Sequence, residues 1–238
     1  MTRPSFLLAV PLLSLPNLAS ADFYSHRYAG ISFGDTGQSG FCEAADRFVQ
    51  RVDAGPEMAS SDKCSDTGSS VKLYAGWRWS PYLAVEASLQ RLNRTELGFY
   101  LSNDLGKFLH IIDKVETHLG AGYIVGHWPL AGDSFSLFGK LGGGFWSGQL
   151  HEKQTGQDLV TFVDLNTGEV FEELDNVNRR GSNGDTGFMY GYGAGVSYVH
   201  DNAWALRLEW ETLQSMGSDE LRGTFDANTL SLGWSTHF

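Results

Sequence analysis

The feature that most constrains the fold of this chain is a period-2 alternation of bulky apolar residues with small or polar ones. The closing stretch TLSLGWSTHF shows it well, with serine, glycine and histidine on one parity. The bulky residues on the other parity are Leu230, Leu232, Trp234 and Phe238. Successive side chains of a β-strand point to opposite faces, so this pattern predicts a strand with one apolar face. A large aromatic residue at the last position is unusual, because chain ends are ordinarily polar and frayed.

The same alternation recurs along the chain and predicts eight strands. They span residues 23–34, 70–79, 83–92, 112–128, 134–146, 188–199, 204–212 and 229–238. Short turns and long polar loops connect them. The short turns are 80–82, 129–133 and 200–203, and the long loops are 35–69, 93–111, 147–187 and 213–226. Eight antiparallel strands connected in this way are typical of an all-β, up-and-down transmembrane β-barrel.

The two parities indicate which face of each strand lines the lumen. One parity carries the bulk, and the other is rich in glycine, serine and charge, as in a barrel whose outer face meets lipid. A soluble, lipocalin-like barrel is the alternative, and it would place bulk inside and charges outside. Eight charged residues are predicted to point inward: Lys72, Arg78, Glu86, Glu116, Lys140, Arg207, Glu209 and Glu211. An eight-stranded barrel holds little more than its own side chains, so these charges are expected to neutralise one another and plug the lumen.

Aromatic residues gather near the strand ends in two bands. Beside the short turns are Trp79, Tyr82, Trp128, Phe135, Tyr198, Trp204 and Phe238. At the ends that lead into long loops are Phe145, Trp146, Phe188 and Tyr190. Bands of this kind at the two membrane–water interfaces are a property of membrane barrels.

The first 21 residues predict a secretory signal peptide. Arg3 precedes an apolar run interrupted by two prolines, and an Ala-Ser-Ala cleavage site follows. Residues 22–238 are then expected to form one exported domain. In an exported chain, Cys42 and Cys64 are expected to form a disulfide, since two cysteines alone do not complete a zinc site.

The net charge and the motifs exclude several functions. A formal charge of −11 argues against a nucleic-acid partner. No motif predicts a catalytic, cofactor-binding or metal-ligating site, and the chain is not expected to be an enzyme. His118 and Glu116 share the parity taken as inward and would need a serine at about 3 Å to resemble a hydrolase site. Loops 35–69 and 147–187 are acidic, which fits either solvated loops or recognition of basic surfaces or of cations shared with lipopolysaccharide.

Several stretches resemble the OmpA-type outer-membrane β-barrel family. They are VKLYAGWRWSPYLAVEASL, PLAGDSFSLFGKLGGGFW, GYGAGVSYVHDNAWALRLEWE and the terminal strand that ends in Phe238. The resemblance implies a barrel in a Gram-negative outer membrane with both termini in the periplasm. It also implies that the terminal Leu230, Leu232, Trp234 and Phe238 are read by the barrel-assembly machinery. The peptidoglycan-binding domain of full-length OmpA has no counterpart here, so cell-wall anchoring is not expected.

These observations predict a structural or surface-interaction protein of the outer membrane. Its partners are expected to be membrane lipid, lipopolysaccharide, the assembly machinery and a host or surface ligand at the loops. Two other classes stay open: a lipid-modifying enzyme and a small OmpW-like channel for apolar solutes. Membrane-level Ser/His/acid geometry would favour the first of these, and an apolar lumen or lateral opening would favour the second.

Overall fold

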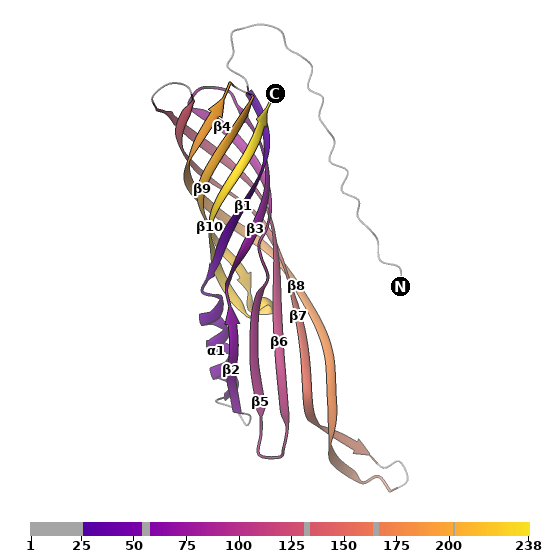
Figure 1. Cartoon of the computed structure of the whole chain (residues 1–238). Coiled ribbons are helices and arrows are strands. Elements are labelled where there is room, and N and C mark those ends of the chain that lie inside the picture. The colour runs from indigo at the N-terminus through magenta and orange to yellow at the C-terminus, as the bar shows by residue number, and fades with distance from the viewer. Residues whose placement is uncertain (1–25, 54–57, 131–133, 164–166, 202) are drawn as a thin grey trace.

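The computed structural model describes residues 26–53, 58–130, 134–163, 167–201 and 203–238. The predicted signal peptide, 1–21, lies outside the described residues. Eight long strands form a closed antiparallel ring. They are β1 (His26–Ser39), β3 (Thr67–Arg78), β4 (Leu83–Arg91), β6 (Phe108–Pro129), β7 (Phe135–Val163), β8 (Val170–His200), β9 (Trp204–Ser218) and β10 (Gly223–His237). The predicted all-β, eight-stranded up-and-down barrel is confirmed (Figure 1).

The ring closes where the last strand meets the first. β10 pairs with β1 over a register that begins at Tyr28 opposite His237. Beyond it, the Arg27 amide donates to the Phe238 carbonyl at 3.2 Å, and the Phe238 amide donates back to the Arg27 carbonyl at 2.9 Å. An unpaired sheet edge in lipid costs several kcal/mol per backbone group, which explains why the last residue of the chain lies within the ladder.

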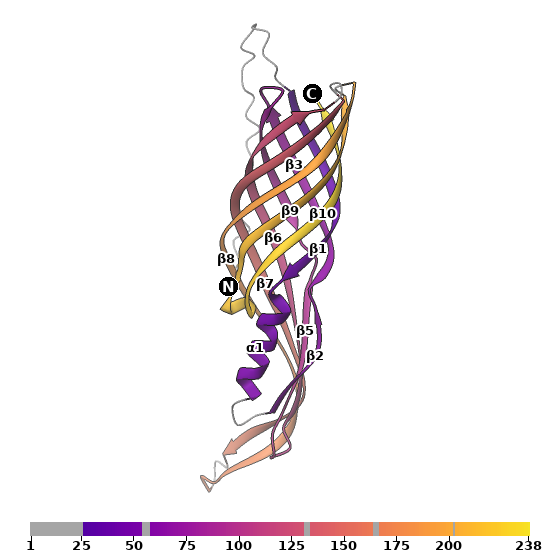
Figure 2. The same cartoon turned by 90° about the vertical axis from the view of Figure 1, so that its left-hand side faces the viewer.

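The strands differ greatly in length. About 9–11 residues suffice to cross a bilayer, yet β7 has 29 residues and β8 has 31. Both continue past the barrel as a hairpin, in which Val163 pairs with Val170 (Figures 1 and 2). The apolar alternation ends near Phe145 and Phe188, so the strands predicted over 134–146 and 188–199 were shorter than β7 and β8.

Two of the predicted long loops contain regular structure. Loop 35–69 holds helix α1 (Phe41–Asp53) and strand β2 (Met58–Ser65), and loop 93–111 holds β5 (Thr95–Ser102). β2 pairs with β5, and β5 pairs with the part of β6 beyond β4, so the sheet continues past the ring. A short 3-10 turn, η1 (Asp219–Leu221), connects β9 to β10. Among the described residues, no helix is long and apolar enough to cross a membrane.

Helix α1 lies beside the long-strand end of the barrel (Figure 2). Gly40, with φ of 90°, turns the chain out of β1 into the helix, a backbone conformation that glycine adopts without strain. Glu43 in the first turn and Arg51 in the last turn complement the helix dipole. The helix buries Phe41 and Val49 against the strands.

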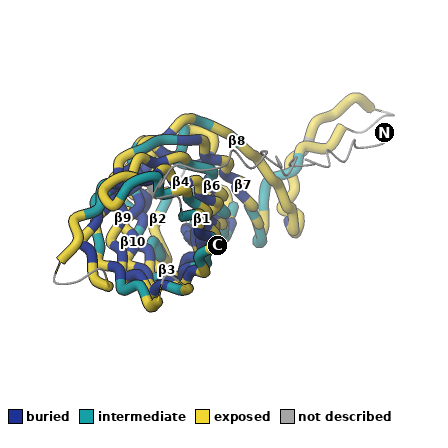
Figure 3. Tube along the Cα trace, turned by 90° about the horizontal axis from the view of Figure 1, so that it is seen from above, coloured by how far each residue is buried: buried dark blue, intermediate teal, exposed yellow. Residues whose placement is uncertain are grey.

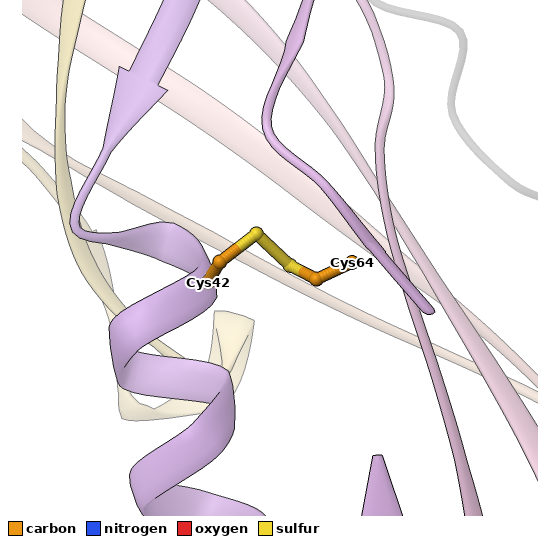
Figure 4. Close-up of a disulfide and its surroundings, with 2 residues drawn as sticks. All are labelled: Cys42 and Cys64. Carbon is orange, nitrogen blue, oxygen red and sulfur yellow. A yellow bond between two sulfur atoms is a disulfide. The ribbon is translucent and has the colours of Figure 1, made fainter. Parts of the chain in front are cut away.

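The disulfide predicted between Cys42 and Cys64 is present. Their Cα atoms are 5.8 Å apart, and the bond ties the first turn of α1 to β2 (Figure 4). The bond therefore joins the two elements that the sequence pattern left unassigned within loop 35–69.

The parity rule holds for most of the barrel. Exposed and buried residues alternate around the ring (Figure 3), and bulky residues such as Leu73, Leu141 and Leu232 lie on the outside. The prediction for β6 was wrong, because its inward parity is the apolar one. The inward residues of that strand are Val115, Leu119, Tyr123 and Val125. Trp146, predicted in an aromatic band, is also buried inside.

Candidate functional site

Six ionisable side chains lie together inside the barrel, and they are termed the lumen charge cluster. They are Lys72 from β3, Glu86 from β4, Lys140 from β7, and Arg207, Glu209 and Glu211 from β9. All six are at most 8 % exposed. Three bases face three acids, so the cluster carries no net charge when every group is ionised.

Two lysines lie between the carboxylates of neighbouring inward positions on β9. Lys72 Nζ lies 2.5 Å from Glu209 Oε1 and 3.0 Å from Glu211 Oε2. Lys140 Nζ, from the opposite wall, lies 2.5 Å from each of the same two side chains. Lys140 Nζ also lies 4.1 Å from the ring centre of Tyr123. The arrangement links three strands across the lumen through two acids.

Arg207 joins the lysine part of the cluster to Glu86. Its guanidinium lies 2.5 Å from Glu86 and 2.6 Å from Glu209. The Tyr28 hydroxyl donates to Glu86 at 3.0 Å, and the guanidinium stacks over the Phe138 ring at 4.1 Å. Each carboxylate therefore has at least two partners, which is the condition under which buried ions offset their loss of hydration.

Small residues make room for this filling. A Cβ added at Gly30 would lie 2.6 Å from the Tyr74 ring, and one at Gly76 would lie 2.2 Å from the Tyr28 ring. Both glycines therefore allow a tyrosine to occupy the lumen next to the charges. The interior of an eight-stranded barrel is about wide enough for side chains to fill, and these two glycines admit the two tyrosines there.

Arg78 lies apart from the cluster, at the short-turn end. It donates hydrogen bonds to the carbonyl oxygens of Ser80 and Pro81 in the adjoining turn. It also lines a cavity of about 310 Å³ at this end, together with Arg207 and His127. A cavity thus lies at the short-turn end, and the lumen charge cluster lies further along the barrel toward the long-strand end.

Glu116 was predicted to point inward, and this prediction was wrong. Because β6 has the reverse parity, Glu116 lies on the outer face, where Arg91 and Arg94 pair with it. The parity of β6 was assigned wrongly because its outward positions include glycine at 120, 122 and 126, and small residues are typical of a lumen face. Six of the eight predicted inward charges thus form the lumen charge cluster, Glu116 lies on the outer face, and Arg78 lies apart from the cluster at the short-turn end.

His118 lies on the outer face for the same reason. It stands opposite Ser147 in the β6–β7 register. No hydrogen bond between their side chains is present in the described part of the chain, and Glu116 is held by arginines. A serine–histidine–acid relay is therefore not assembled at this place. Within the described ranges, no three His, Cys, Asp or Glu side chains gather as a metal site would require.

An apolar cap, which the sequence did not indicate, closes the long-strand end. It packs residues of α1, β5, β6, β7, β8, β9 and β10 together. Its larger members include Phe41, Leu97, Phe99, Leu109, Ile111, Trp146, Leu150, Met189, Leu213, Met216, Leu221 and Phe225. Two interior layers thus follow the cavity: charges in the middle and apolar side chains at the long-strand end.

One polar interaction anchors the edge of the apolar cap. Arg222, next to η1, donates to Asp113 of β6 at 2.7 Å and pairs with Glu152 of β7. Its guanidinium also lies 4.8 Å from the ring centre of Phe48 on α1. A single arginine therefore connects the β9–β10 connection, the extended hairpin and the helix.

The residues predicted as an assembly signal occupy the outer face of β10. Leu230, Leu232 and Trp234 are exposed there, and Phe238 is 73 % exposed. Their exposure continues the apolar outer surface to the short-turn end of the barrel. On the same surface, the predicted aromatic bands are represented by exposed residues at both ends, such as Trp128 and Phe145.

Comparisons with known proteins agree with this architecture. Residues 5–238 match the outer membrane protein beta-barrel domain family. Similar solved structures include Ail, the attachment invasion locus protein of Yersinia pestis, crystallised with the heparin analogue sucrose octasulfate. It is 16 % identical with a TM-score of 0.41, and the match covers 89 % of this chain and 99 % of that one.

Two further structures show the same range of similarity. Neisserial surface protein A (NspA) is 13 % identical with a TM-score of 0.42, covering 90 % of this chain and 97 % of that one. The N-terminal β-barrel domain of Pseudomonas aeruginosa OprF is 12 % identical with a TM-score of 0.37, covering 89 % and 97 %. No curated protein matches by sequence. On the family match over almost its whole length, the chain belongs to the outer membrane protein beta-barrel family and resides in the bacterial outer membrane.

Proposed function

We propose that this protein is a closed outer-membrane barrel that serves a structural and surface-interaction role through its extended long-strand end. In this proposal the short turns face the periplasm and the long-strand end is extracellular. The single observation that carries the proposal is the filled interior. The lumen charge cluster and the apolar cap follow each other along the barrel, so a solute would have to displace both.

The charge cluster argues against the channel alternative. A conduit for apolar solutes would expose them to six ionisable groups whose partners lie within 3.0 Å. Separating such pairs costs several kcal/mol, because each ion is then left in a medium that solvates it poorly. The lipid-modifying alternative lacks an observation that favours it, since Glu116 is held by two arginines on the outer face.

Planar-bilayer recording tests the plug. We expect the refolded protein to give no large, stable conductance, because the ion pairs hold the lumen closed. The matched experiment uses Lys72→Ala with Glu211→Ala, which removes one base and one acid and leaves the remaining cluster balanced. Large, stable conductance of the wild-type protein would refute the plug, whereas conductance only in the double variant would support it.

The extended β7–β8 hairpin is the proposed surface-interaction element. Its distal part carries four exposed acids: Glu169, Glu172, Glu173 and Asp175. Charge complementarity therefore favours a ligand with a basic surface. We expect cells that display the protein to adhere to immobilised polylysine, and the variant with all four acids changed to Gln or Asn to adhere much less. Equal adhesion of the two strains would exclude the tip as the contact.

The outer face of β10 is the proposed contact for the barrel-assembly machinery. The exposed Phe238 closes the ring through its backbone while its side chain stays available on the outside. Deleting Phe238 is expected to lower the amount of heat-modifiable, folded barrel in the outer membrane. Replacing Thr236, on the same strand, with Ser serves as the control and should leave that amount unchanged.

A further inference from the structure

The outer face of the sheet beyond the barrel carries an unusual excess of basic residues. The corrected parity of β6 places them on the same face as Leu89, Ile124, Phe145 and Phe188, whose side chains are exposed on the barrel exterior. This group, termed the basic outer face, consists of Lys63, Arg91, Arg94, Lys114, Lys153 and Arg180. The whole chain has a net charge of −11, so six bases on one face are a local reversal of its charge.

The strand register places these residues side by side. Arg91 of β4 stands opposite His118 of β6, two residues past the pair formed by Leu89 and Gly120. Further along β6, Lys114 lies between Glu96 of β5 and His151 of β7. Directly opposed side chains on one face have Cβ atoms about 5 Å apart. With Lys63 of β2 beside β5, the basic outer face is therefore one contiguous surface over β2, β4, β5, β6, β7 and β8.

The acids on this face neutralise only part of its charge. Glu116 is shared by Arg91, at 3.3 Å, and by Arg94. Glu96 is shared in the same way by Lys63 at 3.3 Å and Lys114 at 3.2 Å. Each acid has two bases, which leaves one positive charge over at each place. Asp62, a third acid on this face, lies 3.3 Å from His110 and offsets one of the remaining positive charges.

A third pair of bases has no acid at all. Lys153 of β7 stands directly opposite Arg180 of β8, and both are exposed. Neither forms an ion pair with any residue in the described ranges. Like charges in directly opposed positions destabilise a sheet. A bound anion between them would remove that cost.

The height of the patch indicates which anion it meets. Arg91 lies two residues past the row of Phe145 and Phe188, which are exposed members of the aromatic band at this end of the barrel. From that level to the level of Lys153 is six residues along β6, from His118 to Ile112. At about 3.3 Å per residue this is roughly 20 Å along the strand. The basic outer face thus begins at the membrane boundary and extends away from the membrane toward the long-strand end.

We propose that the basic outer face binds the phosphate groups of a lipopolysaccharide molecule in the outer leaflet. Lipopolysaccharide carries phosphates at the boundary of its acyl chains and on the inner sugars further from the membrane. Bases spaced along the strands away from the membrane match this spacing of phosphates. Arginine and lysine are the side chains that bind phosphate most strongly. The inference rests on the proposed function, in which the long-strand end is extracellular. It adds the site at which a lipid of the outer leaflet would be held.

The test compares two double variants of the full-length protein refolded in detergent, with purified lipopolysaccharide as the probe. Lys153→Ser with Arg180→Ser removes the opposed pair. Arg47→Ser with Arg179→Ser removes the same charge from exposed positions elsewhere, and Arg179 is the neighbour of Arg180 on the opposite face of β8. We expect the first variant to bind lipopolysaccharide roughly 10- to 30-fold more weakly, and the second to bind within about twofold of wild type.

The probe itself supplies the second comparison. Dephosphorylated lipopolysaccharide should bind wild-type protein no better than intact lipopolysaccharide binds the Lys153/Arg180 variant. Equal binding of the two probes, or equal losses in the two variants, would overturn the proposal. Equally tight binding of phosphatidylglycerol vesicles would overturn the assignment to lipopolysaccharide and indicate a general site for anionic lipid. These results are independent of the conductance and adhesion experiments, so failure here is distinguishable from failure of the proposed function.

Discussion

The lumen charge cluster and the basic outer face use the same residue types in opposite ways. Inside, three bases meet three acids, and every base lies within 3.0 Å of a carboxylate. Outside, four of the six bases share two acids, and the other two, Lys153 and Arg180, oppose each other. Burial makes an unbalanced charge intolerable, whereas water and counterions screen one at the surface. An excess of charge therefore persists only where solvent or a ligand can meet it.

Removing one acid from the lumen should give the largest effect. Glu209 contacts all three bases of the cluster. Glu209→Ala is expected to lower the free energy of unfolding by about 3–5 kcal/mol, because an uncompensated positive charge stays buried. Urea unfolding of the barrel in liposomes, followed by tryptophan fluorescence, measures the change. Lys153→Ala on the basic outer face is the control, expected within about 0.5 kcal/mol of wild type. Similar losses of unfolding free energy in both variants would show that the buried cluster and the basic outer face do not differ in this way.

The disulfide tests whether the long-strand end is a separate unit from the lumen. Replacing Cys42 and Cys64 with Ser removes a cross-link over 22 residues of sequence. Such a link is worth about 3 kcal/mol in the loop-entropy account. We expect α1 and β2 to become sensitive to protease while the barrel keeps its heat-modifiable mobility. A barrel that unfolds together with the helix would show that the two regions form one cooperative unit.

Much of the fold could be predicted because lipid imposes strong rules on a barrel. An outer face must be apolar and the ring must close, so strand number, order and the inward position of residues such as Lys72 and Glu209 are visible as period-2 alternation. The same rules do not act beyond the membrane. There β7 and β8 continue with polar residues, and the alternation that marks a strand disappears.

The errors have the same origin. On β6 the inward residues Val115 and Leu119 belong to the apolar cap, so bulk lies inside and the parity looks inverted, which misplaced Glu116. Helix α1 was missed, although Phe41, Phe48, Val49 and Val52 follow a helical spacing that a search for 3.6-residue periodicity detects. The closeness of Lys153 and Arg180 depends on register, which the sequence pattern does not specify.

Replacing a complete ion pair in the lumen tests whether the barrel depends on the balance of buried charges or on their number. Lys72→Met with Glu211→Met removes one base and one acid and leaves two of each. We expect a change in the free energy of unfolding of no more than about 1–2 kcal/mol, since apolar side chains of similar volume replace a buried pair at little cost. Glu211→Met alone should cost about 3–5 kcal/mol. The same urea titration measures both, and equal losses would show that the charges themselves, and not their balance, stabilise the barrel.

The smallest effect is expected on the basic outer face. Desolvation acts against ionisation of Glu96, but the hydrogen bonds and charges of Lys114 and Lys63 together outweigh it and hold the pKa of its carboxyl below the ordinary value of 4.5. A carboxyl whose pKa is lowered on folding contributes stability above its unfolded pKa, and this contribution is lost as the pH falls through the folded value. Because the group is partly exposed, screening limits the contribution to well under 1 kcal/mol.

Glu96→Gln should therefore change the free energy of unfolding only slightly at pH 7, and the difference from wild type should shrink further below pH 4. In 1 M salt, where the screening length is about 3 Å, the difference at pH 7 should vanish as well. Glu209→Ala should keep most of its loss of stability in the same salt if the lumen is closed to ions, as proposed. If salt abolished the effect of Glu209→Ala too, the cluster would be open to solvent, and the contrast between a sealed interior and a screened exterior would fail.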